Sequence, residues 1–297
     1  MSAAISPATQ RPYGVQRVCR VWAVPRSTFY RAAQPAEPGS VRPRGPKPRL
    51  DDAGLLAAIQ ADLAASPFTG EGHRKVWARL RYGLGLPVGR NRVLRLMRQH
   101  QLLSPFRRPA RPANDHDGTL LTDAPDVLWG TDATLVPTVE DGRVWVFAAI
   151  DHGNAEVIGQ FVSTDGSRFS ALQPISQAVA ARFGGLGADS ARGVTVRADH
   201  GPQYVSRHFT RQLAHWGAGL SHSYPYQPQT NGVIERFFRT LKEQAIWGRT
   251  FRDVAEVRAA VAGFVARDNA EWRLERLGYL SPLAYRAQQL EVGNRAA

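Results

Sequence analysis

Residues 127–162, VLWGTDATLVPTVEDGRVWVFAAIDHGNAEVIGQFV, decide the fold. Apolar residues, many of them β-branched or aromatic, are concentrated in three runs at 127–137, 143–150 and 156–162. The turn-forming sequence Glu140-Asp141-Gly142 separates the first two runs. Such runs joined by short turns predict a meander of three antiparallel strands.

Helices and strands alternate beyond this meander. Apolar periodicity predicts a helix at 168–183, a short buried strand at 194–198, a helix at 204–216, a brief strand around Leu220 and a helix at 230–247. Three antiparallel strands followed by this alternation are the order of an RNase H-like α/β core, a mixed five-stranded sheet flanked by helices. A further apolar stripe at Val254, Val257, Val261 and Phe264 predicts a helical C-terminal segment.

Two stretches rich in proline and arginine, 34–49 and 104–112, interrupt the first part of the chain. Proline fixes φ and donates no hydrogen bond, so both stretches are predicted to be semi-extended linkers. The predicted division is a helix-turn-helix-like segment at 1–33, a linker at 34–50, a basic helical domain at 51–112, an RNase H-like core at 120–248 and a helical segment at 249–297.

Both parts before residue 112 are predicted to be all-α. Apolar residues recur at helical spacing over 15–22, residues 23–25 break the pattern, and a second short helix begins near Arg26. Two short helices about a tight turn fit a helix-turn-helix, and they fit an ordinary basic helical hairpin equally well. The basic domain adds amphipathic helices near 55–63, 73–82 and 91–103.

Excess positive charge is confined to the first third of the sequence. The formal net charge is +13, but residues 1–111 hold 20 Lys and Arg against 5 Asp and Glu, whereas residues 112–297 hold 18 against 20. This asymmetry indicates an acidic polymer as partner, and nucleic acid rather than a membrane. The longest apolar run, 144–150, is far shorter than the roughly 20 residues of a membrane helix, and no secretory signal is expected.

Arginine side chains on the predicted helices are the candidate phosphate contacts. Arg92 and Arg95 share a face of the helix at 91–103, opposite its apolar stripe. Such a face is often merely solvated, but the surrounding positive charge favours contact with DNA. The candidate DNA contacts in this part of the chain are Arg26, Arg74, Lys75, Arg90, Arg92, Arg95 and Arg98.

Three carboxylates stand where the predicted core elements can bring them together. Asp132 lies inside the first strand, Asp199 follows the strand at 194–198, and Glu235 lies one turn into the last core helix. Each has an ordinary explanation alone: a capped strand end, a turn beside Gly201, or a solvated helix position. Together they are predicted to converge at one edge of the sheet, because a strand-end carboxylate projects into a cleft from a rigid backbone.

The helix that carries Glu235 has two distinct faces. Its apolar face is made by Ile234, Phe237, Phe238, Leu241 and Ala245. A second face aligns Asn231, Glu235, Arg239 and Lys242 at spacings of four and seven residues. Asn231, Arg239 and Lys242 are therefore further candidate contacts to a bound DNA strand.

The donor set favours hard divalent cations. Cys19 is the single cysteine and the eight histidines are scattered, so no zinc site is expected. Three carboxylates instead suit Mg²⁺, with Mn²⁺ as a substitute. Two such ions, about 3.5 to 4 Å apart, would activate an attacking oxygen at a phosphate and stabilise the leaving oxygen, in hydrolysis and in transesterification alike.

At these residues the chain resembles the DDE transposases with a retroviral-integrase-type catalytic core, specifically the OrfB half of bacterial insertion-sequence transposases. The most specific feature is the spacing, with 35 residues between Asp199 and Glu235 and a basic residue, Lys242, seven positions after the glutamate. The flanking sequences agree at 199–204 (DHGPQY), 228–237 (PQTNGVIERF) and 277–282 (LGYLSP). The middle part is similar to the helical DNA-binding region of that family at 72–80 and 92–97.

The resemblance implies cleavage at transposon ends to expose 3′-hydroxyls, followed by their attack on target DNA, with Asp132, Asp199 and Glu235 as the metal-binding triad. It also implies a homo-oligomer in a synaptic complex, a candidate partner encoded by an upstream reading frame, and a cytoplasmic, nucleoid-associated protein in a bacterium. Two alternatives remain open: an RNase H-like nuclease that only hydrolyses, and a non-catalytic DNA-binding protein from a decayed element.

Two departures from the family concern the C-terminal segment and the N-terminal part. Asp268 stands where relatives often have a tyrosine before the asparagine, here Asn269, and no histidine lies near Leu274. The zinc-binding N-terminal domain of retroviral integrases is excluded by the single cysteine, and the helix-turn-helix-like segment takes its place.

Overall fold

The computed structural model describes residues 2–33, 50–105, 120–223 and 231–296, with side chains up to residue 291. The chain forms two compact units, Met1–Arg49 and Leu50–Ala297. Most of both predicted linkers lies outside the described residues. No helix of the described ranges is long and apolar enough to cross a membrane.

The first unit contains two short helices, α1 (Gly14–Val21) and α2 (Arg26–Ala33). Ala23 lies between them with a positive φ of 50°, which turns the chain sharply after α1. The prediction of two helices about a tight turn is confirmed. Arg26 is the first residue of α2 and is exposed.

A three-helix region opens the second unit. It consists of α3 (Asp52–Ala65), α4 (His73–Ala78), which continues as a π-helical turn (Arg79–Gly83), and α5 (Arg90–Gln99). The Asp51 side chain caps α3 by accepting a hydrogen bond from the backbone N–H of Gly54. The helices enclose a small core of their own, made by Leu55, Ile59, Val76, Leu80, Val88, Val93, Leu96 and Met97.

A mixed five-stranded sheet forms the centre of the second unit. Its strands are β1 (Leu128–Pro137), β2 (Arg143–Asp151), β3 (Val157–Ser163), β4 (Thr195–Ala198) and β5 (Gly219–His222), in the order β3-β2-β1-β4-β5. The first three strands are antiparallel, and β4 and β5 run parallel to β1. The predicted meander and the five-stranded sheet are both confirmed.

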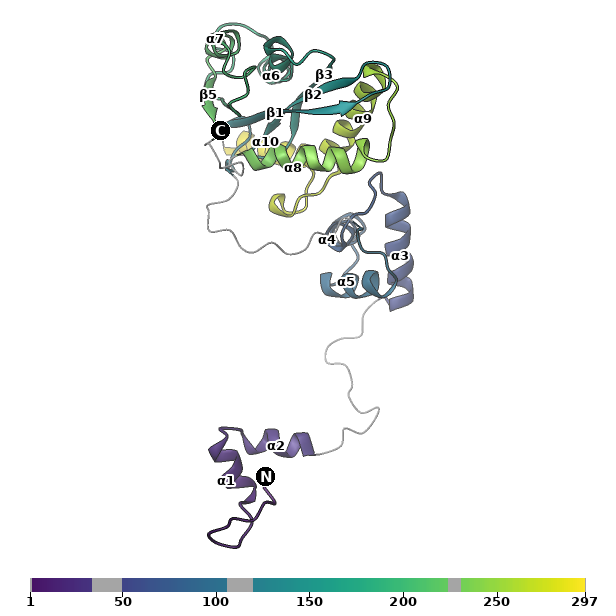
Figure 1. The fold of residues 1–297 in the computed structure, drawn as a ribbon, viewed down its shortest axis with the longest axis vertical. Coiled ribbons are helices and arrows are strands. Elements are labelled where there is room, and N and C mark those ends of the chain that lie inside the picture. Colours follow the sequence, from purple (N-terminus) through teal and green to yellow (C-terminus); the bar gives the residue numbers. More distant parts are fainter. Residues whose placement is uncertain (1, 34–49, 106–119, 224–230, 297) are drawn as a thin grey trace. The chain divides into compact units, whose positions relative to one another are not determined.

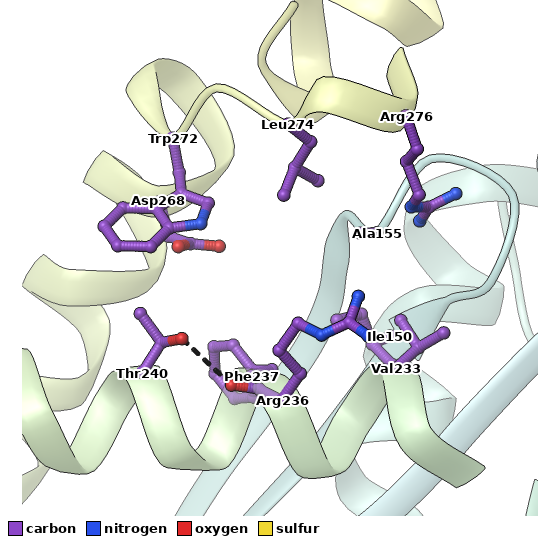
Figure 2. A pocket seen from close by; sticks show the side chains of 10 residues that line it. All are labelled: Ile150, Ala155, Val233, Arg236, Phe237, Thr240, Asp268, Trp272, Leu274 and Arg276. Carbon is purple, nitrogen blue, oxygen red and sulfur yellow. Dashed lines mark hydrogen bonds between the residues drawn. The ribbon is translucent and has the colours of Figure 1, made fainter. Parts of the chain in front are cut away.

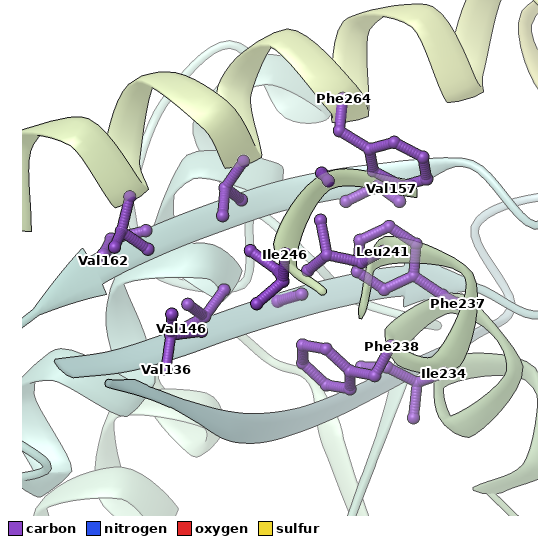
Figure 3. Packing of buried hydrophobic residues seen from close by; sticks show 14 of the residues in the cluster. Val136, Val146, Val157, Val162, Ile234, Phe237, Phe238, Leu241, Ile246 and Phe264 are labelled. Atoms are coloured by element: carbon purple, nitrogen blue, oxygen red, sulfur yellow. The ribbon is translucent and has the colours of Figure 1, made fainter. Parts of the chain in front are cut away.

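Helices cover both faces of this sheet (Figure 1). One face packs against α6 (Arg168–Phe183) and α7 (Arg207–His215), with Trp129 of β1 at its centre. The other face packs against α8 (Gly232–Leu241) and α9 (Val254–Glu271), with Val136 of β1 pointing towards them (Figure 3). The chain then ends with a short 3-10 helix (Glu275–Leu277) and α10 (Pro282–Ala296).

Two helix boundaries differ from the sequence prediction. The helix expected at 204–216 begins at Arg207, because the Ser206 hydroxyl accepts a hydrogen bond from the backbone N–H of Phe209 and caps it there. The helix expected at 230–247 changes to a π-helical turn (Lys242–Ile246) at the end of α8. Apolar periodicity continues through both boundaries, so it could not reveal either.

The three-helix region packs on the α8–α9 face of the sheet. Phe68 belongs to the same core cluster as Phe264 of α9, and its ring makes an edge contact with Trp272 at 4.8 Å. Thr69 and Gln244 exchange hydrogen bonds, of 2.9 Å from the Thr69 N–H and 2.8 Å to the Thr69 carbonyl oxygen. Residues 50–105 therefore share a core with the sheet domain, although the charge of the sequence changes only at residue 111.

We expect Gly159→Ala to destabilise the second unit by about 1 to 3 kcal/mol, because a Cβ at Gly159 would overlap the carbonyl group of Pro174 where α6 lies on β3. Chemical unfolding of both proteins measures this difference. Gly185→Ala is the matched control, because a Cβ there meets no atom within 4 Å. Equal unfolding midpoints for the two variants would contradict the close approach of α6 to β3.

Candidate active site

The parallel pairing of β1 and β4 brings two carboxylates to the same level of the sheet. Gly130 of β1 pairs with Arg197 of β4. Asp132 and Asp199 each lie two residues beyond this pair, so they occupy equivalent positions along the two adjacent strands. Asp132 lies within β1, whereas Asp199 directly follows β4 and its carboxylate accepts a hydrogen bond of 2.8 Å from the Gly201 N–H.

The third carboxylate comes from α8, which packs on β1. Glu235 lies in the first turn of α8. Its neighbours on both sides of the sequence face the core, with Val233, Ile234, Phe237 and Phe238 all buried. Glu235 is therefore left on the exposed side of the helix, beside Asp132. The structure brings Asp132 and Glu235 into one cleft, while Asp199 lies level with Asp132 beside the neighbouring strand.

Burial and mutual repulsion both act on Asp132. The pKa of Asp132 is raised to about 7, mainly by burial and also by the negative charges of Asp199 and Glu235, while a hydrogen bond from the Ala133 N–H at 2.7 Å and the charge of Lys242 act to lower it. Burial also raises the pKa of Glu235. A carboxylate in this position is stabilised by a cation, because added positive charge offsets both effects.

An open cleft of about 360 Å³ lies beside Asp132 and Glu235. Asp132 and Glu235 both line it, and the basic residues Arg239 and Lys242 of its lining are called its basic wall. Trp247 closes one end with 58% of its side chain exposed. The sequence did not reveal Trp247, because a tryptophan after an apolar helix face is expected in the core. The π-helical turn, in which the Trp247 N–H donates to the Lys242 carbonyl oxygen at 2.7 Å, places it on the rim instead.

The donor set fits a hard divalent cation. Three carboxylates supply oxygen ligands, and burial of one of them without a compensating ion pair favours a bound cation. Within the described ranges no three Asp, Glu, His or Cys side chains meet closely enough to hold a metal ion. Ligation of one ion by all three carboxylates therefore requires their side chains to move towards a common point.

A second, smaller pocket is lined by another face of α8 and by none of the three carboxylates (Figure 2). Arg236 and Thr240 of α8 face it, opposite Asp268, Trp272 and Arg276 from the C-terminal segment. Its volume is about 40 Å³, which is too small for a nucleotide. The α8 helix therefore separates a closed, well-packed side from the open carboxylate cleft.

Asn231 lies at the start of α8 but does not face the cleft. It is 5% exposed, and its amide donates a hydrogen bond of 3.4 Å to the Thr131 carbonyl oxygen of β1. A Cβ at Gly130 would lie 2.8 Å from the Asn231 amide oxygen and 2.6 Å from Nε2 of His152. Asn231 thus anchors α8 to β1, and its predicted DNA contact does not fit this position.

Most of the candidate DNA contacts of the three-helix region are paired with acids. Arg74 and Arg90 both form ion pairs with Glu275, at 2.7 Å and 3.4 Å. On the other side of α5, Arg92 and Arg95 both pair with Asp52, at 2.7 Å and 2.6 Å. Arg98 is exposed near His73, whose pKa is lowered by burial and by the charges of Arg74, Arg90 and Arg98.

Lys75 is buried between the three-helix region and the C-terminal segment. Its ammonium lies against the ring of Trp272 and 3.9 Å from Glu71. Burial lowers the pKa of Lys75 to about 6, although the charges of Glu71 and Asp268 raise it. The predicted DNA contact of Lys75 does not fit this position, which instead makes Lys75 a packing residue. Asp268 of α9 is a second acid whose charge acts on Lys75.

Comparisons with known proteins assign these elements to one kind of enzyme. Two models described as integrase core domain match residues 122–228 and 217–282, and a model described as HTH-like domain matches residues 50–110. The transposase of insertion sequence element IS629 from Shigella sonnei is 29% identical over 293 residues, 95% of both chains. The chain therefore contains an HTH-like domain and an integrase core domain, and it is similar to an insertion-sequence transposase over nearly its whole length. The predicted identity as a transposase with an integrase core that cleaves and joins DNA is confirmed.

A second transposase is similar to the chain to the same degree. Transposase InsD of insertion element IS2 from Escherichia coli is 29% identical over 259 residues, 80% of both chains. Among solved structures, the catalytic core of BIV integrase is 18% identical, covers 57% of this transposase and 99% of that chain, and gives a TM-score of 0.41. The catalytic core of HTLV-2 integrase in complex with magnesium is 13% identical, covers 55% and 97%, and gives a TM-score of 0.40.

Asp132→Asn should stabilise the transposase at pH 8 and leave its stability unchanged near pH 4. The folded-state pKa of about 7 lies above the value of about 3.9 in the unfolded chain, so stability is lost as the pH rises between these values, by a few kcal/mol at most. Urea unfolding without divalent metal measures this. Asp123→Asn, at an exposed aspartate, is the control. If the free energies of unfolding of wild type and Asp132→Asn differed by the same amount across the pH range, the explanation would be refuted.

Proposed function

We propose that Asp132, Asp199 and Glu235 are the metal ligands with which this transposase cleaves the ends of its element and joins the 3′-hydroxyls to target DNA. The observation that carries this proposal is that Asp132 and Glu235 line one cleft, with Asp199 level with Asp132 in the register of β1 and β4. Two Mg²⁺ or Mn²⁺ ions, when bound, supply Lewis-acid activation of the attacking oxygen and charge stabilisation of the leaving oxygen.

The protein positions the reacting phosphate between the carboxylates and the basic wall of the cleft. The Ala133 N–H holds the Asp132 carboxylate in place, and the core packing of α8 fixes Glu235. Arg239 and Lys242 lie one and two turns after Glu235 and bind phosphate oxygens of the strand to be cut.

The three-helix region and the first unit bind the transposon ends. Arg74, Arg90 and Arg98 gather on one side of α5, with Arg92 and Arg95 on the other. Arg26 at the start of α2 adds a contact from the first unit. Two ends are joined to one target in the same reaction, so the active form is a homo-oligomer in a synaptic complex, with the product of an upstream reading frame as a further candidate partner. Its place is the bacterial cytoplasm, at the nucleoid.

Asp199→Asn and Glu235→Gln should each lower the rates of end cleavage and strand transfer by roughly 100-fold or more. Loss of residues that only support metal ligands already costs up to about that factor. Binding of the end DNA should remain within about twofold of wild type, since phosphate contacts come from other residues. Cleavage and joining are measured on duplexes that carry the DNA flanking the coding sequence, with Mg²⁺.

Glu291→Gln is the control for this experiment, because it also removes one exposed carboxylate, far along the sequence in α10. If Asp199→Asn or Glu235→Gln cleaved the ends at the wild-type rate, the proposed ligand set would be refuted. Cleavage without any joined product in the wild-type protein would instead favour the nuclease that only hydrolyses.

Glu275 forms ion pairs with two of the arginines proposed to bind DNA, Arg74 and Arg90. Hydrogen bonding by the Tyr279 hydroxyl, followed by the charges of Arg74 and Arg90, lowers the pKa of Glu275. Glu275 is therefore ionised at neutral pH and competes with DNA phosphates for both guanidinium groups. It also joins the three-helix region to the segment before α10.

Glu275→Gln should therefore bind end DNA more tightly than wild type, by up to about fivefold, because an exposed ion pair is worth at most about 1 kcal/mol. Fluorescence anisotropy at several salt concentrations measures the affinity. Glu291→Gln is again the matched control, since it changes the net charge equally. If both variants bind DNA alike, Glu275 does not compete with DNA for Arg74 and Arg90.

A further inference from the structure

Three arginines surround an open cleft between α6 and α7, away from the carboxylates. The cleft has a volume of about 390 Å³ and is lined by Arg168 at the start of α6 and by Arg207, His208, Arg211 and Gln212 of α7. Every ionisable side chain in this lining is basic. This is a local concentration of positive charge in a part of the chain that is close to neutral as a whole.

The arginines of this cleft differ from those of the three-helix region. Those of α5 are held by Asp52 and Glu275. In the part of the chain that the structure describes, no acid lies within ion-pair distance of Arg168, Arg207 or Arg211. Like charges gathered without a counter-charge destabilise the fold slightly and are offset by a bound anion. A guanidinium group matches a phosphate with two parallel hydrogen bonds.

Phe169 holds part of this basic surface in place. Its side chain is 52% exposed, although it follows the first residue of α6. The guanidinium carbon of Arg168 lies 5.0 Å from the centre of the Phe169 ring, and the ring of His208 lies 4.6 Å from it. Stacking of this kind orients Arg168 and His208 towards the cleft and lowers the entropy lost when they bind a ligand.

The register of the sheet places the cleft at the end of the molecule that carries the carboxylates. Ser163, the last residue of β3, pairs with Trp145 of β2, which pairs with Leu135 of β1, three residues beyond Asp132. Arg168 starts α6 shortly after Ser163. The cleft lies on the α6–α7 face of the sheet, whereas α8 and the three-helix region pack on the opposite face (Figure 1).

We propose that the α6–α7 cleft binds the phosphate backbone of the target DNA during strand transfer. The inference rests on the proposed function, because strand transfer requires two DNA molecules at one set of carboxylates. The α8–α9 face carries the three-helix region, which is assigned to the ends. The second duplex is therefore held from the opposite face, at the same end of the sheet, by Arg168, Arg207 and Arg211.

The test uses the full-length protein with Arg207→Ala and Arg211→Ala together. The protein is first bound to end duplexes made from the DNA that flanks the coding sequence, so that the end-binding surface is occupied. Binding of a 30-base-pair duplex of random sequence is then measured over a range of salt concentrations, and strand transfer into a plasmid is measured with Mg²⁺. Two matched controls are a variant with lysine at both positions and Arg192→Ala, which removes an exposed arginine paired with Asp189 at 3.0 Å.

The alanine variant should lose about two units of the slope of log affinity against log salt for the random duplex, because each phosphate contact contributes about 0.9. Strand transfer should fall about 10-fold or more, while end binding and end cleavage stay within twofold of wild type. The lysine variant should keep most of the slope, and Arg192→Ala should match wild type.

An unchanged salt slope together with unchanged strand transfer would overturn the inference. An equal loss of end binding and target binding would also overturn it, because the cleft would then hold the ends. Failure of the proposed function is separately visible, since it would appear as cleavage by Glu235→Gln, whatever the alanine variant does. Thermal unfolding of the alanine and lysine variants shows whether either substitution disturbs α7.

Discussion

The active site depends on the parallel pairing of β1 with β4. This pairing brings Asp132 and Asp199 level with each other, and a slip of one residue would turn Asp132 towards α6 and α7 instead of α8. The close approach at Gly130 reinforces the register, because Asn231 and His152 both lie where a larger residue would have its Cβ. The same contact fixes the beginning of α8, and hence Glu235, against β1. Backbone geometry thus gathers the carboxylates in spite of their repulsion.

The sequence predicted the elements of the core, because these depend on local patterns. Alternating apolar residues marked β1 to β3, and the acids stood at the ends or exposed faces of elements whose other side had to be buried. The roles of Asn231 and Lys75 could not be predicted in this way. Both are polar residues on helices that looked solvent-facing, and only tertiary contacts, with Thr131 in one case and Trp272 in the other, bury them.

The distribution of acids determines which arginines are available, and net charge does not. The first third of the chain carries most of the positive charge, yet Asp52 and Glu275 each hold two of its arginines. Glu275 lies some 200 residues away in the sequence, so no local pattern could reveal its pairing. Conversely, the near-neutral remainder contains the α6–α7 cleft, where three arginines gather away from acids. A balanced total conceals this separation of charge.

The packing of the three-helix region on α9 links DNA capture to the catalytic helix. Phe68 contributes to the core that supports α8, and Thr69 is bound to Gln244 in the π-helical turn that directly follows α8. That turn carries Lys242 and ends at Trp247, which are two of the groups at the rim of the carboxylate cleft. A displacement of the three-helix region would therefore move the basic wall of the cleft before it moved Asp132. The hydrogen bonds between Thr69 and Gln244 thus connect the three-helix region to the turn that carries Lys242.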